Sequence, residues 1–276
     1  MYRNYVFDFY GTLADIRTDE EDPALWKKMS EIYRALGAAY EPRELQYAFR
    51  RLENEEAERL GREERKRPGN EEKEQPERGE PESLGHGGGD RPEAENAEPD
   101  LTKVFAMLYH DKSAFCDASQ AKMTAITFRA LSRKFLRTYD GVKELLEELH
   151  ERGRGVYLLS NAQTDFTRPE IEMLGLTRYF DGILLSSEQG CKKPSPVFFR
   201  RLLEQYRLNP AESIMTGNDE AADIAGAQSV GMDTLYIHTD ISPKEYGKVQ
   251  ATYRVMDGDF RKAVRILLNA DIKIRQ

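Results

Sequence analysis

Residues 3–15 read Arg-Asn-Tyr-Val-Phe-Asp-Phe-Tyr-Gly-Thr-Leu-Ala-Asp. The apolar run at residues 5–7 is typical of a strand that is covered on both faces of a sheet. It ends at the carboxylate of Asp8, and Gly11 then allows the chain to turn sharply. Open α/β sheets bind their ligands beyond the carboxyl ends of the strands. The stretch therefore predicts a first strand that presents Asp8 for chemistry, with a purely structural strand end as the alternative.

The chain from residue 139 onward alternates strands with helices. Strands are expected at residues 156–159, 183–185, 214–215 and 234–237, with an edge strand at 252–255. Helices are expected around residues 142–149, 171–174, 197–206 and 259–270. This alternation predicts an α/β fold with a doubly wound, parallel, Rossmann-like sheet. Right-handed crossovers then bring the carboxyl ends of the strands to one edge of the sheet.

Residues 16–138 carry helical periodicity instead. Asp22 suits a helix N-cap and Pro23 the first helical position, and further helices are expected at 42–60, 101–109 and 119–136. The last of these includes Phe135 and Leu136. We therefore expect residues 1–15 and 139–276 to form the α/β core, and residues 16–138 to form an inserted all-helical domain.

Residues 61–100 differ in composition from the rest of this insertion. They contain 13 acidic and 7 basic residues, and Leu84 is their only large apolar residue. Such a segment buries too little apolar surface to offset the entropy of ordering it. We expect a disordered acidic loop, with an acidic interaction arm as the alternative.

Composition excludes several classes of protein. The chain has 276 residues and a net charge of -8, which argues against nucleic acid as a partner. It has no apolar run of about 18 residues and no signal-peptide pattern, so we expect no membrane association. Its two cysteines, Cys116 and Cys191, are far apart in sequence, which favours a reducing cytoplasm over a disulfide framework.

Four polar clusters follow four of the expected strands. They are Asp8 with Thr12, then Ser160, then Lys192 and Lys193, and finally Asp219 with Asp223. A carboxylate nucleophile, a hydroxyl donor, a cation and paired acids are the groups that phosphoryl transfer needs for positioning and charge stabilisation. The order and spacing of the clusters, rather than any one of them, predict a site for this reaction.

The stretch Asp8-Phe9-Tyr10-Gly11-Thr12-Leu13 resembles the first motif of the haloacid dehalogenase superfamily of hydrolases. The resemblance implies that Asp8 is the nucleophile and that the helical insertion is the cap domain found in one branch of the family. It also selects Lys193, which stands directly before a proline, over Lys192. Most phosphatase members carry a second Asp, a general acid and base, where this chain has Tyr10.

Further roles follow from the chemistry and from the resemblance. Mg²⁺ prefers oxygen ligands, and we expect Asp8, Asp219 and the backbone carbonyl of Tyr10 to supply them. Asp223 is expected to orient either the metal or Lys193. Ser160, followed by Asn161 in a second motif, is expected to donate a hydrogen bond to the phosphoryl oxygens.

These expectations favour a Mg²⁺-dependent phosphatase that acts on a small phosphate ester through an aspartyl-phosphate. Two alternatives stay open. The first is a 2-haloacid dehalogenase, because these enzymes carry Tyr at the position of Tyr10 and need no metal. The second is a weakly active or inactive binding or regulatory protein, because a Tyr with a pKa near 10 is a poor general base. We expect the Tyr10 side chain to stand in the place of the missing acid. The sequence indicates neither the substrate nor the oligomeric state.

Overall fold

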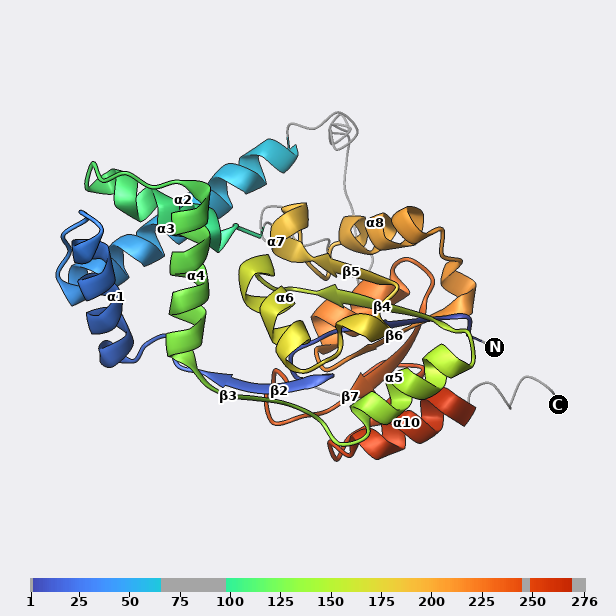
Figure 1. The fold of residues 1–276 in the computed structure, drawn as a ribbon. Helices are drawn as coiled ribbons and strands as arrows, with labels where there is room; N and C mark the ends of the chain where they lie inside the picture. Colours follow the sequence, from blue (N-terminus) through green and yellow to red (C-terminus); the bar gives the residue numbers. More distant parts are fainter. Residues whose placement is uncertain (1, 66–97, 245–248, 270–276) are drawn as a thin grey trace, which may run out of the picture.

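A computed structural model describes residues 2–65, 98–244 and 249–269 of the chain (Figure 1). Its main sheet has six parallel strands in the order β5-β4-β1-β6-β7-β8. These strands are β1 (Asn4–Phe7), β4 (Gly155–Ser160), β5 (Gly182–Leu185), β6 (Ser213–Gly217), β7 (Asp233–Ile237) and β8 (Tyr253–Val255). The doubly wound α/β fold expected from the sequence is confirmed.

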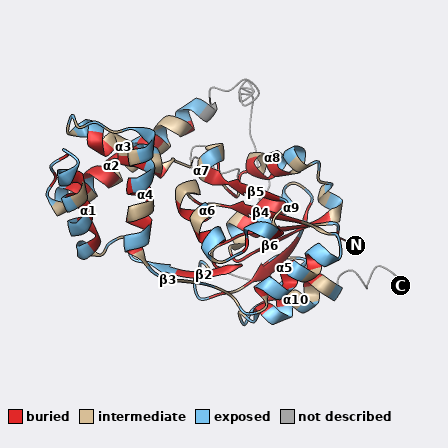
Figure 2. Ribbon diagram, viewed as in Figure 1, coloured by how far each residue is buried: buried red, intermediate tan, exposed pale blue. Residues whose placement is uncertain are grey.

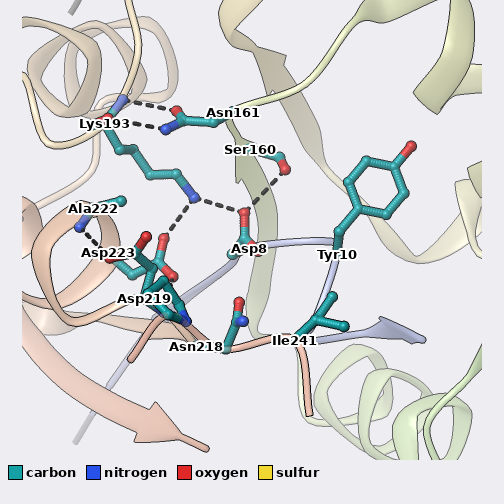
Figure 3. Close-up of a pocket in the computed structure, with 11 residues that line it drawn as sticks. Asp8, Tyr10, Ser160, Asn161, Lys193, Asn218, Asp219, Ala222, Asp223 and Ile241 are labelled. Carbon is teal, nitrogen blue, oxygen red and sulfur yellow. Dashed lines mark hydrogen bonds and ion pairs between the residues drawn. The ribbon is translucent and has the colours of Figure 1, made fainter. Parts of the chain in front are cut away.

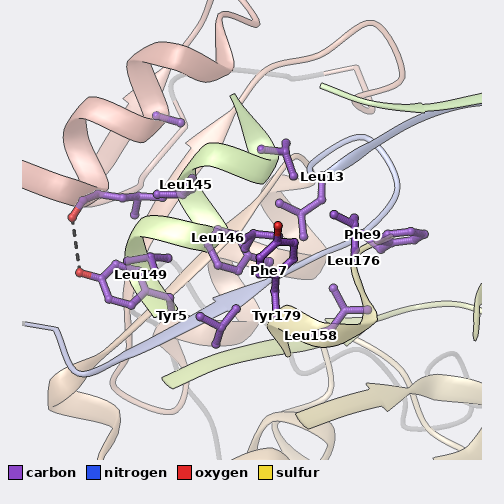
Figure 4. Packing of buried hydrophobic residues seen from close by; sticks show 14 of the residues in the cluster. Tyr5, Phe7, Phe9, Leu13, Leu145, Leu146, Leu149, Leu158, Leu176 and Tyr179 are labelled. Carbon is purple, nitrogen blue, oxygen red and sulfur yellow. Dashed lines mark hydrogen bonds between the residues drawn. The ribbon is translucent and has the colours of Figure 1, made fainter. Parts of the chain in front are cut away.

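Helices cover both faces of the sheet, and the strand sequences explain why. These helices are α5 (Val142–Glu151), α6 (Thr164–Met173), α7 (Ser186–Gln189), α8 (Pro196–Tyr206), α9 (Gly226–Gln228) and α10 (Phe260–Asn269). Successive strand residues point to opposite faces, so Phe7 packs in the same apolar cluster as Leu146 of α5 (Figure 4), whereas Val6 packs in the cluster that contains Phe198 of α8. The red strands at the centre of Figure 2 are buried as a result.

A second apolar core lies within a bundle of four helices (Figure 1). The helices are α1 (Pro23–Ala35), α2 (Pro42–Arg65), α3 (Leu101–Asp111) and α4 (Ala118–Ser132). Asp22 caps α1 by accepting a hydrogen bond from the Ala24 amide, as its position before Pro23 predicts. Aromatic rings fill the bundle, and Phe166 of α6 joins this core from the side of the sheet.

The bundle is joined to the sheet by two strands that the sequence analysis did not anticipate. Strands β2 (Ala14–Thr18) and β3 (Arg133–Thr138) pair antiparallel, and they are the two links of the chain between bundle and sheet (Figure 1). The expectation that residues 16–138 are all helical is therefore wrong at both ends, and the helix expected to contain Phe135 and Leu136 ends at Ser132. Strand pairing across more than 100 residues overrides the local helical spacing.

The acidic segment is described only at its ends. Residues 61–65 continue α2, so the loop expected to begin at residue 61 does not begin there. Residues 66–97 lie outside the described part of the chain. In the residues that the structure does describe, no helix combines the length and apolar character needed to cross a membrane.

Candidate active site

The carboxyl ends of four parallel strands place polar side chains around one cavity of about 190 Å³ (Figure 3). Seven of the residues singled out from the sequence line it, and they are Asp8, Tyr10, Ser160, Asn161, Lys193, Asp219 and Asp223. Asp8 follows β1, Ser160 ends β4, and Asp219 follows β6. The expected convergence of these side chains at one edge of the sheet is what the structure shows.

A buried lysine connects two carboxylates at the centre of the cavity. The Nζ atom of Lys193 lies 2.7 Å from Asp8 Oδ1 and 2.6 Å from Asp223 Oδ1, and it also donates to the Leu159 carbonyl. Burial opposes the charge on Lys193, but Asp223 and Asp8 raise the pKa of its ammonium above the usual value. Burial, reinforced by the charge of Asp8, raises the pKa of Asp223 against the opposing effect of Lys193.

The neighbouring lysine does not take part. Lys192 turns toward Glu98, with 3.5 Å between Nζ and a carboxylate oxygen. Asn161 fixes which lysine faces inward, because its side-chain amide donates to the Lys193 carbonyl and its oxygen accepts from the Lys193 amide. The choice of Lys193, made from the proline that follows it, matches this geometry.

The two acids beyond β6 have different surroundings. Both oxygens of Asp223 are hydrogen-bonded, because one accepts from Lys193 and the other accepts from the Asp219 amide at 3.0 Å. These contacts fit the expected role of Asp223 in orienting Lys193. Asp219 Oδ1 accepts from the Ala222 amide as a helix cap. Its Oδ2 accepts no hydrogen bond from the residues that the structure describes.

Asp8 also has one oxygen committed and one available. Ser160 donates to Asp8 Oδ1 at 3.0 Å, and the same oxygen contacts Lys193. Within the described residues, Asp8 Oδ2 accepts no hydrogen bond. Lys193 and Ser160 thus hold the carboxylate by one oxygen and leave the other for a ligand or a reacting atom.

Thr12 does not reach the cavity. Its hydroxyl is completely buried and donates to Asn218 Oδ1 at 3.3 Å, while Asn218 Nδ2 contacts Ser242. Thr12 therefore stabilises the turn that follows β1 without lining the cavity, and Asn218 connects this turn to the loop after β7. Sequence reasoning missed this loop, which contributes Ile241 to the cavity wall (Figure 3), although it too follows the carboxyl end of a strand.

Gly11 makes this close approach possible. It adopts φ +81°, and a Cβ atom at this position would lie 2.4 Å from Asn218 Nδ2. We expect Gly11→Ala to lower the free energy of unfolding by about 2 kcal/mol or more, from left-handed strain plus displacement of Asn218. Gly153→Ala is the matched control, because Gly153 has φ +63° and nothing within 4 Å of the added Cβ. Equal losses in chemical denaturation of the two variants would contradict the role given to Asn218.

Tyr10 is placed differently from its expected position. Its hydroxyl points away from Asp8 (Figure 3), donates to Glu170 Oε2 at 2.5 Å and lies 2.9 Å from the Thr167 hydroxyl. Burial raises the pKa of the phenol. The expectation that the phenol stands in the place of the missing acid is therefore wrong, because Glu170 holds the hydroxyl on the far side of the ring.

Comparison with known proteins identifies the family. A family model for haloacid dehalogenase-like hydrolases matches residues 2–231. The chain belongs to this family. A solved 2-haloacid dehalogenase from Pseudomonas syringae pv. Tomato DC3000 superposes on this haloacid dehalogenase-like hydrolase with a TM-score of 0.60 at 18% identity, covering 97% of this chain and 100% of that one. At this identity the likeness shows a common fold and no more.

Two curated relatives are phosphatases. This haloacid dehalogenase-like hydrolase is 42% identical over 93 residues to the ribulose-1,5-bisphosphate 5-phosphatase of Halopiger xanaduensis. The matched residues make up 34% of this chain and 39% of that protein. It is 29% identical over 124 residues to the phosphoserine phosphatase of Thermus thermophilus, covering 45% and 49%. The matches span less than half the length of either relative.

Proposed function

We propose that this chain is a Mg²⁺-dependent phosphatase for a small phosphorylated metabolite, and that Asp8 forms an aspartyl-phosphate. The observation that carries the proposal is the position of Asp8, which lines the cavity with Oδ1 held by Lys193 and Ser160 and Oδ2 available. Family membership and the phosphatase activity named for both relatives support the same reaction class.

The residues present fit a magnesium ion. Asp8 Oδ2 and Asp219 Oδ2 are both available and belong to residues that line the same cavity, and Mg²⁺ typically binds one or two carboxylates together with substrate phosphate and water. We assign Asp8, Asp219 and the Tyr10 carbonyl as protein ligands. When bound, the ion neutralises phosphate charge beside the nucleophile.

The protein groups have distinct tasks in this proposal. Asp8 attacks phosphorus in line with the departing alkoxide, so a new O–P bond forms as the ester O–P bond breaks. Lys193 keeps its proton and offsets the charge of the transferring group, while Asp223 holds that ammonium in place. The Ser160 hydroxyl moves from Asp8 to a phosphoryl oxygen. Water then attacks the aspartyl-phosphate at phosphorus, which releases phosphate and restores Asp8.

Tyr10 bears on the choice of substrate. Because its hydroxyl is held by Glu170, it does not protonate the leaving oxygen, and general acid help is worth about 10² to 10⁴ in rate. Esters whose leaving groups need little protonation, such as aryl and acyl phosphates, are therefore the favoured class. The same Tyr is compatible with the metal-independent 2-haloacid dehalogenase reaction, which makes that reaction the second candidate.

A substrate panel separates the candidates. Aryl, acyl and alkyl phosphates and 2-haloacids are assayed with Mg²⁺ and with EDTA. Phosphate release that requires Mg²⁺ and is fastest for aryl and acyl phosphates supports the proposal. Release of halide in EDTA supports the dehalogenase reaction, and no turnover of any compound favours a binding or regulatory protein.

Asp219 provides a test of the metal assignment. We expect Asp219→Asn to weaken Mg²⁺ binding by about 10-fold or more, because the amide is uncharged and is a poorer ligand than the carboxylate. Titration calorimetry measures the affinity directly. Asp240→Asn is the control, since Asp240 is an exposed acid of the loop after β7 that pairs with Arg17. Unchanged affinity in Asp219→Asn would remove this residue from the ligand set and return attention to Asp223.

A further inference from the structure

Tyr10 lines the cavity, and behind its ring lies a buried polar cluster whose other members do not. We call it the Glu170 cluster, and its members are Tyr10, Arg129, Arg133, Thr167 and Glu170. Glu170 is completely buried, and its carboxylate accepts from the Tyr10 hydroxyl at 2.5 Å, from Arg129 Nε at 2.8 Å and from Arg133 Nη1 at 2.9 Å. A second Arg129 nitrogen lies 3.3 Å from the other oxygen, which makes that contact bidentate.

The cluster joins parts of the molecule that are far apart in sequence. Arg129 comes from helix α4 of the bundle and Arg133 from strand β3, whereas Thr167 and Glu170 come from α6 beside the sheet. Tyr10 belongs to the turn that carries Asp8. Helices α4 and α6 pack against each other (Figure 1), and the only covalent links between bundle and sheet within the described residues are β2 and β3. Noncovalent contacts of this kind therefore set how the bundle sits against the part of the molecule that carries the sheet.

The guanidinium of Arg129 lies over two aromatic rings. Its guanidinium carbon lies 5.2 Å from the centre of the Tyr10 ring and 5.4 Å from the centre of the Phe166 ring. A guanidinium over a ring face is attracted by the ring quadrupole, and the attraction grows when the group is desolvated. Tyr10 thus contacts the bundle with its ring face and contacts α6 with its hydroxyl.

A buried ion pair of this form acts more on geometry than on net stability. Removing charges from water is costly, so the pairing of Glu170 with two arginines roughly offsets its own desolvation. The paired state requires all partners in place together, because a buried carboxylate with one arginine missing is poorly compensated. The arrangement therefore favours one seating of the bundle over slightly displaced ones.

We propose that the Glu170 cluster is a latch that seats the helical bundle on the core and, through the Tyr10 hydroxyl, positions the Asp8–Tyr10 turn. Glu170 is thus a positioning residue, and Tyr10 couples the bundle to the nucleophile. The catalytic half of this inference rests on the proposed phosphatase function, whereas the seating of the bundle does not.

The test compares two acids of α6 that both contact the bundle. Glu170→Gln removes the charge that the arginines share. Asp165→Asn is the matched control, because Asp165 accepts from Thr102 at 2.8 Å and pairs with Lys122 at 3.2 Å, yet has no contact with Tyr10. Spin labels on cysteines introduced at the exposed positions Met123 of the bundle and Met256 of the core report the bundle–core distance, with Cys116 replaced by Ser.

The latch predicts that Glu170→Gln broadens the distance distribution and lowers kcat for an aryl phosphate by about 10-fold or more, since small displacements of a reacting group are costly. Asp165→Asn should keep kcat within about twofold of the wild type. Tyr10→Phe, which removes a single hydroxyl, should lower kcat in the same direction, and its loss should not add to that of Glu170→Gln in the double variant. If Glu170→Gln does not fold, Tyr10→Phe and its distance distribution carry the test.

Three results would overturn the latch. They are an unchanged distance distribution in Glu170→Gln, equal effects of Glu170→Gln and Asp165→Asn on kcat, and additive losses for Tyr10→Phe and Glu170→Gln. The distance measurement needs no substrate. A wild-type protein that hydrolyses no phosphate ester would end the proposed function, while the labels would still decide whether Glu170 seats the bundle.

Discussion

Asp8→Asn is expected to lower kcat for every phosphate ester by at least about 10⁴-fold, the scale seen when a covalent nucleophile is removed. The amide has nearly the shape of the carboxylate, but it is neither anionic nor a competent nucleophile toward phosphorus. Lys193 stays paired with Asp223 at 2.6 Å in this variant, so the buried ammonium keeps a counterion. We therefore expect the fold to survive, and near-ultraviolet circular dichroism together with thermal unfolding checks that it does.

The control for this variant is Asp15→Asn. Asp15 is another buried acid near the first strand, but it pairs with Arg137 on the β2–β3 ribbon and does not line the cavity. Its activity should stay within a few-fold of the wild type. A folded Asp8→Asn protein with substantial turnover, prepared without wild-type contamination, would exclude Asp8 as the nucleophile.

Lys193→Met is expected to reduce both activity and stability. The side chain of Lys193 is 1% exposed and pairs with the carboxylates of Asp8 and Asp223. Removing one partner from a buried ion pair typically costs about 3–5 kcal/mol, because the remaining charge is uncompensated. The loss in free energy of unfolding, measured by urea denaturation at pH 7, should fall in that range. Turnover should fall as well, since the ammonium that offsets the charge of the transferring group is lost.

The pH dependence of this loss has a definite sign. Without Lys193, the buried carboxylate of Asp223 has a higher pKa in the folded state than in the unfolded state, because burial raises that pKa and the lysine that opposes the rise is gone. A folded protein that contains such a group loses stability as the pH rises through the folded-state pKa of that group. The difference between Lys193→Met and the wild type should therefore be larger at pH 8 than at pH 5.

Lys192→Met is the control for Lys193→Met. Lys192 is the adjacent residue, its side chain is 34% exposed, and its 3.5 Å pair with Glu98 is partly solvated. Partly exposed pairs of this kind contribute at most about 1 kcal/mol. Similar losses for the two lysine variants would contradict the assignment of Lys193 as the central cation.

The sequence was sufficient to locate the site because local rules and topology agree there. Asp8 and Ser160 come directly after a short apolar run, Asp219 follows another within four residues, and parallel strands bring such positions to one edge. The same reasoning could not separate the tasks of Asp219 and Asp223. That difference depends on which oxygens the backbone and Lys193 already occupy, and this is a property of the folded turn.

Contacts between residues that are far apart in sequence explain the features that were not predicted, which are strand β3 and the orientation of Tyr10. Residues 133–138 continue an apolar spacing that suits a helix, and they form a strand because residues 14–18 lie beside them. Glu170 and Arg129 are charged residues on helices, which are usually solvated. They are buried here because α4 packs on α6, and the orientation of Tyr10 follows from their contacts. No spacing within either helix indicates this partner.

The central claim is that Asp8 becomes phosphorylated, and trapping this adduct tests it most directly. Because the Tyr10 hydroxyl is held by Glu170, water that attacks the intermediate receives no help from a general base at that position, so the adduct should accumulate. Wild-type protein is mixed with an aryl phosphate and Mg²⁺, quenched in acid within one turnover, and its peptides are analysed by mass spectrometry. We predict a hydroxylamine-sensitive phosphoryl group on Asp8 that is absent from Asp8→Asn. Steady release of phosphate with no phosphoryl group on Asp8 at any quench time would contradict the account.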